Sequence, residues 1–387
     1  MRLLVVSHKL CWEDPASPTG YSTDGGFPDQ MRALSELMDE TTILLPLDGT
    51  PHHGGKGMLS GKNFRVIPLP KPRADEGVKR KLAMIPWTAA NIGRIRAFIE
   101  QADCVHTPIP GDIGTVGMLA AHAAKKPLFV RYCGNWTVQH TAMERFWRRF
   151  MERNAGGRNV MLATGWAPDP PSALNPNIKW IFSTTLTEER LKRQARKRTL
   201  PERRPLRLIT VGRLEKGKGI HRSIAAVRML ADRGVDCVLD IVGDGPQRDM
   251  LAAEADRQGV GNRIRFLGRT DREGVFAFLA DADLFLFPTD TEGFPKAVVE
   301  AMASGLPVVA TPVSALPHVL GRGGGILMRD SSPASIAGSV ESCIADPRRY
   351  AAMSEKAVET AASYTLERWK QELAEILTSV WGPLRER

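Results

Sequence analysis

Short apolar segments alternate with helical patterns along this chain, and the alternation runs twice, with a break near residue 200. Strands separated by helices pair in parallel, and a parallel sheet needs helices over both of its faces. The pattern therefore predicts two α/β halves. We expect strands at 3–7, 42–45, 64–67, 103–106, 128–132, 160–164 and 179–182, and then at 206–211, 238–242, 264–267, 284–287 and 308–311.

Helical periodicity fills the segments between these strands. A basic stretch with two prolines, 190–207, separates the halves and is interpreted as a linker. Two doubly wound, Rossmann-like halves would bind ligands beyond the carboxyl ends of their strands. We expect helices at 28–38, 89–100, 115–124, 141–154, 220–233, 247–258, 273–280 and 296–304, and a helical tail over 346–381.

Length and composition agree with a two-domain globular protein. The chain has 387 residues, of which 43% are hydrophobic and 25% charged, and this length favours more than one domain. No run approaches the roughly eighteen apolar residues that span a bilayer, and the N-terminal MRLLVVSHKL is interpreted as a first buried strand. The five cysteines form no CxxC or other metal-type spacing, which is typical of a reducing cytoplasm.

The formal net charge of +10 has two main sources. One is the 190–207 stretch, with nine Lys or Arg. The other is the helix predicted at 141–154, where arginines adjoin an apolar face. This helix would suit an anionic membrane surface, but its apolar stripe could equally pack on the core. No recognised nucleic-acid-binding motif accompanies the basic residues. The apolar face consists of Phe146, Trp147, Phe150 and Met151, and the arginines are Arg145, Arg148, Arg149 and Arg153.

Two carboxylates eight positions apart mark the segment FPTDTEGFPKAVVEAMASGLPVVAT. Glu292 lies in a Gly/Pro-rich loop after a predicted strand, and Glu300 lies on the helix that follows. The loop residues Gly293, Phe294 and Pro295 leave backbone N–H groups near the start of this helix, where they can meet hydroxyl or anionic oxygens. Alternatively, both carboxylates are simply solvated.

A second segment, VGRLEKGKGI at 211–220, joins the first strand of the second half to its helix. Arg213 and Lys218 place two cations beside a helix N-terminus, which is an arrangement that suits a diphosphate. The alternative interpretation is a basic surface loop. No Walker A sequence can be aligned here, so hydrolysis of a nucleoside triphosphate is disfavoured.

Together these segments resemble the E-x7-E and GR-x4-K elements of retaining GT-B glycosyltransferases of family 4, also called glycosyl transferases group 1. The resemblance is dense from 206 to about 327 and scattered before that. It implies two Rossmann-like domains facing across a cleft: an acceptor domain at 1–200 and a nucleotide-sugar domain at 201–364. It also implies that a C-terminal helix at 365–387 crosses back to the first domain, anchored by Trp369 and Trp381.

The resemblance also assigns roles to residues. Arg213, Lys218 and Glu292 would be catalytic, the two cations at the leaving diphosphate and Glu292 beside the donor sugar. Donor binding would further involve backbone groups at the helix start and, from the opposite domain, a glycine loop. Alternatively, this loop is a plain turn. The donor-binding residues would be Gly25 and Gly26 in that loop, Arg269 beside the nucleobase, Gly293, Phe294 and Pro295 at the helix start, and Glu300 on the ribose hydroxyls.

The chain departs from the family pattern at Cys133, where relatives have a histidine that contacts the donor sugar. A thiol donates hydrogen bonds poorly, so the contact would be lost or would move to Arg131, Asn135 or His140. His106, at the end of a predicted strand, is interpreted either as facing the cleft or as a structural histidine.

The resulting hypothesis is a cytoplasmic, retaining glycosyltransferase, peripheral at the inner face of the membrane if its basic surface binds lipid. It would move a hexose-type sugar from a nucleoside-diphosphate sugar to a glycolipid or polysaccharide acceptor. It would need no cofactor and no metal, because Asp281 and Asp283 precede a strand and lie away from the cleft. The alternatives are a catalytically silent GT-B scaffold subunit and a nucleotide-sugar epimerase.

Overall fold

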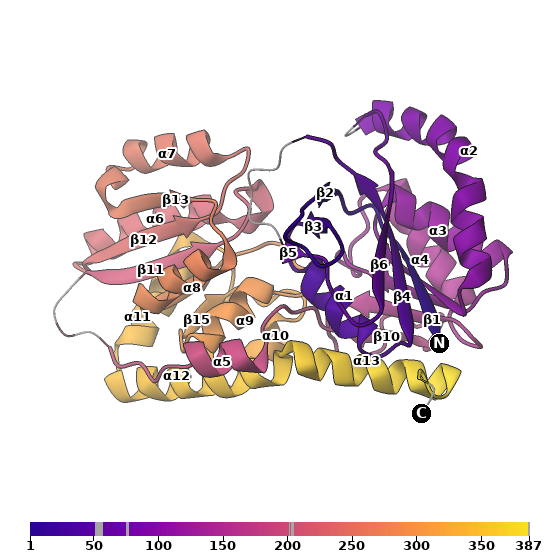
Figure 1. Ribbon diagram of the computed structural model, residues 1–387. Helices are drawn as coiled ribbons and strands as arrows, with labels where there is room; N and C mark the ends of the chain where they lie inside the picture. Colours follow the sequence, from indigo (N-terminus) through magenta and orange to yellow (C-terminus); the bar gives the residue numbers. More distant parts are fainter. Residues whose placement is uncertain (51–56, 75–76, 201, 203–204, 386–387) are drawn as a thin grey trace. The chain divides into compact units, whose positions relative to one another are not determined.

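The computed structural model describes residues 1–50, 57–74, 77–200, 202 and 205–385. Its chain divides into two compact units (Figure 1). Unit 1 comprises Met1–Thr185 and Leu366–Arg387, and unit 2 comprises Leu186–Thr365. The first break lies earlier than the boundary expected at residue 200. Pro201 and residues 203–204 of the predicted linker, and residues 386–387 of the tail, lie outside the described residues.

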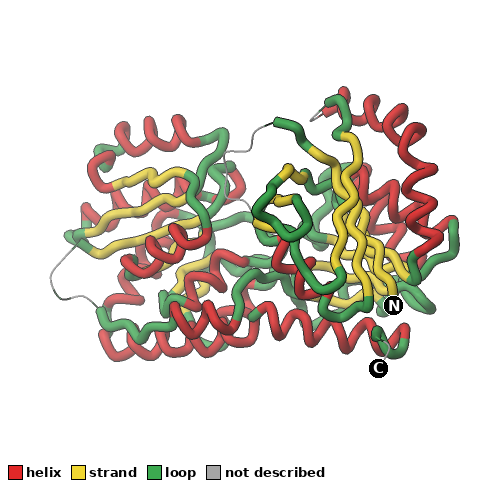
Figure 2. Tube along the Cα trace, viewed as in Figure 1, coloured by secondary structure: helices red, strands yellow, loops and turns green. Residues whose placement is uncertain are grey.

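The sheet of unit 1 is built mainly from parallel strands, which Figure 2 draws side by side. The order is β10-β9-β8-β7-β1-β4-β2-β3-β5, and β6 also pairs with β4. Antiparallel pairing is confined to the short edge strands β2, β3 and β5. The strands are β1 (Arg2–Val6), β2 (Cys11–Glu13), β3 (Tyr21–Thr23), β4 (Glu40–Leu47), β5 (Gly57–Met58), β6 (Phe64–Pro70), β7 (Cys104–Ile109), β8 (Leu128–Tyr132), β9 (Val160–Thr164) and β10 (Ile178–Ile181).

The helices of unit 1 are α1 (Phe27–Ser35), α2 (Gly77–Gln101), α3 (Asp112–Ala123), α4 (Ala142–Asn154) and α13 (Leu366–Trp381). The largest departure from expectation is α2, which was expected at 89–100 and begins at Gly77. Pro86 lies inside this helix, so the proline does not mark its start.

The apolar face of α4 belongs to the core of unit 1. Trp147, Phe150 and Met151 are buried against the sheet, and only Phe146 of the predicted face is exposed. Arg148 is held by Glu152 and lies over the Trp136 ring. The interpretation as a core-packing helix is therefore correct for these residues, because their burial removes them from any membrane surface.

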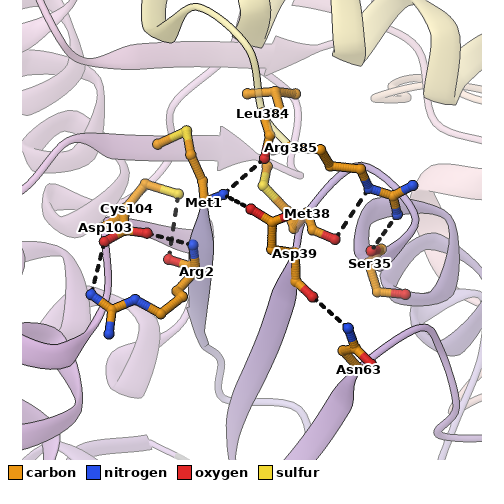
Figure 3. Close-up of polar contacts among 10 residues, drawn as sticks. All are labelled: Met1, Arg2, Ser35, Met38, Asp39, Asn63, Asp103, Cys104, Leu384 and Arg385. Atoms are coloured by element: carbon orange, nitrogen blue, oxygen red, sulfur yellow. Dashed lines mark hydrogen bonds and ion pairs between the residues drawn. The ribbon is translucent and has the colours of Figure 1, made fainter. Parts of the chain in front are cut away.

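The C-terminal segment packs on the first strands of unit 1. The Met1 ammonium bonds to the Asp39 carboxylate and to the Leu384 carbonyl, and Arg385 donates to the Met38 and Ser35 carbonyls (Figure 3). On α13, Trp369 is buried near Arg131, and Trp381 donates to the Arg158 carbonyl. This helix is therefore integral to unit 1.

Unit 2 holds a six-stranded, all-parallel sheet in the order β13-β12-β11-β14-β15-β16. Strands β12 and β13 are added on one side of β11, and β15 and β16 are added on the opposite side, beyond β14. The direction of strand order therefore reverses between the neighbours β11 and β14. The strands are β11 (Leu206–Val211), β12 (Cys237–Val242), β13 (Ile264–Gly268), β14 (Leu284–Phe287), β15 (Val308–Ala310) and β16 (Gly325–Leu327). The helices are α5 (Glu188–Gln194), α6 (Ile220–Asp232), α7 (Arg248–Arg257), α8 (Arg272–Asp281), α9 (Lys296–Ala303), α10 (Leu316–Leu320), α11 (Pro333–Ile344) and α12 (Pro347–Ala361).

The basic stretch that begins at Arg190 is part of unit 2. Arg190 and Arg193 pair with Glu273 of α8. Arg198 donates to the carbonyls at the ends of two helices, Leu279, Ala282 and Ser304. These contacts explain why the break between the units lies before α5, because the arginines fasten the segment to unit 2. Among the described residues, no helix is both long and apolar enough to cross a membrane.

Candidate functional site

The candidate site lies where the strand order of unit 2 reverses. The loop after β11 and the loop after β14 leave adjacent parallel strands at their carboxyl ends. In open α/β sheets, ligands bind in the crevice at this switch point. The two loops carry the predicted Arg213, Lys218 and Glu292.

Lys218 and Glu292 meet directly. The Lys218 Nζ atom is 2.7 Å from Glu292 Oε2, and it also lies 5.7 Å from the centre of the Phe287 ring at the end of β14. Lys218 ends a short 3-10 helix, Lys216–Lys218, and both side chains of the pair are mostly shielded from solvent. The structure thus brings together a cation and a carboxylate that the sequence places 74 positions apart.

The two loops are also joined through their backbones. The Gly217 carbonyl accepts hydrogen bonds from Asp290 N at 2.8 Å and from Thr289 Oγ1 at 3.2 Å. Gly219 has a φ of +67°, and a Cβ atom there would lie 2.1 Å from the Pro288 carbonyl oxygen. Only glycine combines this backbone conformation with so close an approach. The spacing between Lys218 and Glu292 is therefore fixed by the crossing of the loops.

Arg222, on the first turn of α6, is hydrogen-bonded to the β14–α9 loop. Its Nη2 atom donates to the Pro288 carbonyl at 2.7 Å and to Asp290 Oδ1 at 2.6 Å. No sequence motif marks Arg222 or Asp290. The available signal was the position of Arg222 one turn after Lys218, but its partner could not be known without the strand order.

Two further predicted site residues, Arg213 and Arg269, follow strands of the same sheet. Arg213 lies two residues after β11, is well exposed and pairs with Glu215 at 2.8 Å. Arg269 follows β13, two strands away at the same edge of the sheet. The structure therefore joins Lys218 to Glu292, while Arg213 keeps a different partner.

The start of α9 supplies the remaining residues of this group. Pro295 caps the helix, and Phe294 is buried 5.3 Å from the Tyr364 ring. The Gly293 carbonyl accepts from Ser314 Oγ at 3.1 Å, and its N–H donates to Glu292 Oε1 at 3.3 Å. Glu300 is half-buried on the second turn of the helix. Packing of Phe294 thus anchors the loop that presents Glu292.

Gly25 and Gly26 lie in unit 1, just before α1. Gly25 has a φ of +71°, and a Cβ atom on Gly26 would lie 2.0 Å from Thr185 Cγ2. The close packing against Thr185 gives this loop a structural reason for glycine, independent of any ligand.

His106 is a buried structural residue. Its Nδ1 atom bonds to the Phe129 carbonyl at 2.8 Å, and its ring stacks on that of Phe129. Burial, assisted by the nearby Arg131 charge, lowers the pKa of His106 to about 3. The cleft-facing interpretation is therefore wrong. Arg131 is also buried and donates to Gln30 Oε1, whereas Cys133 is exposed.

Unit 1 contains a large cavity of its own. Its volume is about 1130 Å³, which is slightly above the usual range for small-molecule sites. The walls combine apolar side chains with cations and carboxylates. They come from the β1–β2 loop, β2, the segments after β3 and β6, and the N-terminal parts of α2, α3 and α4. Its lining includes His8, Lys9, Trp12, Asp24, Arg80, Lys81, Asp112 and Trp147.

Solved structures share this fold over nearly the whole chain. HepE from Anabaena, in complex with UDP and glucose, has a TM-score of 0.69 and 20% identity, covering 98% of this chain and 99% of that one. Sucrose-phosphate synthase from Thermosynechococcus elongatus has a TM-score of 0.73 and 16% identity, covering 98% of each chain. The fold is therefore that of the GT-B glycosyltransferases, with two parallel-sheet α/β domains.

Residues 191–360 match the family model of glycosyl transferases group 1. This segment is 170 residues long, less than half of the 387-residue chain. A GDP-mannose-dependent alpha-(1-6)-phosphatidylinositol dimannoside mannosyltransferase from Mycobacterium tuberculosis is 38% identical over 144 residues, or 37% of this chain and 36% of that protein. A putative colanic acid biosynthesis glycosyltransferase, WcaL from Escherichia coli, is 38% identical over 122 residues, or 30% of each. The matches thus span about a third of these relatives.

Proposed function

We propose that this protein transfers a hexose-type sugar from a nucleoside-diphosphate sugar to a glycolipid or polysaccharide acceptor, with retention of configuration. The observation that carries the proposal is the Lys218–Glu292 pair at the switch point of unit 2, within the segment that matches the group 1 family. A cation beside a carboxylate suits a ligand that is anionic at one end and rich in hydroxyls at the other.

The diphosphate of the donor would compete with Glu292 for Lys218. When it binds, the ammonium can turn to the phosphate oxygens and leave the carboxylate to accept hydrogen bonds from sugar hydroxyls. As the sugar–oxygen bond breaks, negative charge develops on the diphosphate, and Lys218 and Arg213 stabilise it electrostatically. The acceptor hydroxyl attacks the sugar carbon from the face that the diphosphate leaves. A phosphate oxygen of the leaving group takes the proton of this hydroxyl, so no separate general base is needed.

Glu300 and Arg269 would hold the nucleoside. Glu300 accepts hydrogen bonds from two ribose hydroxyls, and Arg269 lies in the loop beside the nucleobase. The backbone of Gly293, Phe294 and Pro295 would contact the donor near the start of α9, where the helix end carries partial positive charge. Gly25 and Gly26 of unit 1 would approach the donor phosphate.

We propose that transfer needs no divalent metal, because the two cations supply the charge. Asp281 and Asp283 precede β14, at the opposite end of that strand from Glu292, and the Asp283 carboxylate accepts from the Arg207 backbone. Activity is therefore expected to persist in EDTA. Loss of activity that manganese or magnesium restores would contradict this part of the proposal.

The acceptor is assigned to unit 1, whose cavity is large enough for a sugar or headgroup. Two relatives are named as a phosphatidylinositol dimannoside mannosyltransferase and a colanic acid biosynthesis glycosyltransferase, which favours a glycolipid or polysaccharide product. We place the protein in the cytoplasm, at the inner face of the membrane.

A thermal-shift screen with UDP-, GDP- and ADP-sugars tests the proposal. A donor present at a hundred times its Kd stabilises the folded state by about 2.7 kcal/mol. Hydrolysis of the stabilising donor without acceptor would support the transferase over a silent scaffold, and a free epimer among the products would support an epimerase. No shift with any of the nucleotide sugars would overturn the assignment.

A further inference from the structure

The first two turns of α2 present an apolar stripe to solvent. Val78, Leu82 and Ile85 are 71%, 63% and 69% exposed, and their spacing places them on one face of the helix. Single exposed apolar residues are normal on a protein surface, but a continuous stripe indicates an interaction surface. These side chains contribute nothing to the core of unit 1.

The neighbouring face of the same turns lines the unit 1 cavity. This face lies about a quarter of the way around the helix from the stripe. The start of α2 therefore separates the stripe from the cavity. Arg80 on this face donates to Asp112 at the start of α3, with Nε 2.6 Å from Oδ2. The cavity-lining residues of α2 are Gly77, Arg80, Lys81, Met84 and Thr88.

Cations flank the stripe. Between Val78 and Ile85 the helix carries Lys79, Arg80 and Lys81 and no carboxylate; Asp75 and Glu76, which precede it, lie outside the described residues. Lys79 and Lys81 are exposed and form no ion pair within the described part of the chain. Apolar side chains flanked by exposed lysines are the pattern of a helix that lies at an anionic lipid surface.

We propose that the first turns of α2 dock on an anionic lipid bilayer, with Val78, Leu82 and Ile85 in contact with acyl chains and Lys79 and Lys81 at the headgroups. A second copy of the chain is a poorer occupant. Three aliphatic side chains on two turns offer far less than the roughly 800 Å² per partner of a stable interface, and facing lysines repel one another.

Docking in this way brings the cavity to the membrane surface. If the proposed transferase function holds, on which this step rests, the acceptor is a lipid that stays in the bilayer while its polar headgroup enters between α2, α3 and α4. The surface also differs from the one that the sequence indicated, because the apolar side chains of α4 are mostly buried whereas those of α2 are exposed.

Co-sedimentation with vesicles tests the proposal. Wild-type protein is expected to bind phosphatidylcholine vesicles that contain phosphatidylglycerol, to bind pure phosphatidylcholine weakly, and to lose affinity as salt rises to about 0.15 M. The V78S/L82S/I85S variant is expected to bind about a hundredfold less tightly. The K79Q/K81Q variant is expected to lose on the order of thirtyfold at low salt.

A matched control removes exposed apolar side chains elsewhere. Leu174, Met250 and Val380 are 82%, 48% and 37% exposed, so the L174S/M250S/V380S variant has a similar change in composition and should bind like wild type. Circular dichroism and thermal melts establish that all variants are folded. Nucleotide-sugar binding by the same preparations is measured separately, so failure of the donor assignment leaves the vesicle result intact.

Two results would overturn the proposal. One is equal vesicle binding by wild type and V78S/L82S/I85S, including the case in which neither binds. The other is a loss of self-association in V78S/L82S/I85S without vesicles, measured by analytical ultracentrifugation, which would assign the stripe to a second copy of the chain.

Discussion

Lys218 Nζ and Glu292 Oε2 lie 2.7 Å apart at the switch point of unit 2, so each charge neutralises the other. The pair is held by loops that cross at Gly217 and Gly219, and its geometry does not depend on a substrate. A diphosphate that binds Lys218, as proposed, must therefore displace the Glu292 carboxylate. In this proposal, Lys218 strengthens nucleotide binding, and Glu292 weakens it because it competes for Lys218.

Glu292→Gln is expected to strengthen the binding of nucleoside diphosphate while it weakens sugar transfer. The amide no longer competes for Lys218, and for a partly exposed pair the gain is about 1 kcal/mol, or roughly fivefold in Kd. Titration calorimetry measures the change. Glu341→Gln, which breaks an exposed pair with Arg233 elsewhere in unit 2, is the matched control. Weaker nucleotide binding in Glu292→Gln would contradict the competition.

Arg213→Ala is expected to lower turnover about tenfold to a hundredfold and to leave the melting temperature unchanged. A charge-assisted hydrogen bond contributes about 1.5–3 kcal/mol, whereas the exposed pair with Glu215 adds little to stability. Arg329→Ala, which removes another exposed arginine of unit 2, controls for net charge. Equal turnover in Arg213→Ala and wild type would remove this arginine from the diphosphate.

Glu300→Gln is expected to weaken nucleotide binding more than it slows the chemical step. A carboxylate accepts hydrogen bonds from two ribose hydroxyls, and an amide has only one acceptor oxygen. Comparing the Kd for nucleoside diphosphate with the single-turnover rate separates the two effects. A normal Kd with a reduced rate would place Glu300 at the sugar rather than at the ribose.

His106 is expected to make folding stability depend on pH. Burial lowers its pKa to about 3 in the folded state, whereas the unfolded chain takes up the proton near pH 6.5. The contribution of neutral His106 to the free energy of unfolding is therefore complete above pH 6.5. It falls by about 1.4 kcal/mol per pH unit as the pH drops toward 3. Urea unfolding at several pH values should show a shallower fall for His106→Asn, and identical slopes would refute this assignment.

The sequence predicts the sheet of unit 2 well, because strands buried on both faces form continuous apolar runs. The strands at Leu206–Val211 and Leu284–Phe287 are found at the bounds expected. It fails for α2, whose first turns expose Val78, Leu82 and Ile85 and contain Pro86. The spacing of apolar residues in these turns does not distinguish a helix from a loop. Because the turns do not pack on the core, apolar residues are not required at every third or fourth position.

For the site, sequence identifies the residue types but not their partners. Lys218 and Glu292 were each predicted from local motifs, yet their contact depends on β11 and β14 being neighbours. Arg222 was missed for the same reason, because its partners Pro288 and Asp290 belong to the other loop. The α4 face was ambiguous, since buried Trp147 and exposed Phe146 are adjacent and both aromatic.

Calorimetric titration of wild type and Lys218→Ala with UDP, GDP and ADP tests the central claim most directly. We predict that wild type binds at least one of these nucleotides at a single site and that Lys218→Ala binds it tenfold or more weakly, since a hydrogen bond to a charged group contributes about 1.5–3 kcal/mol. Equal affinity in the two proteins, or no binding of any of the three nucleotides by wild type, would contradict the assignment of this pair to the donor diphosphate.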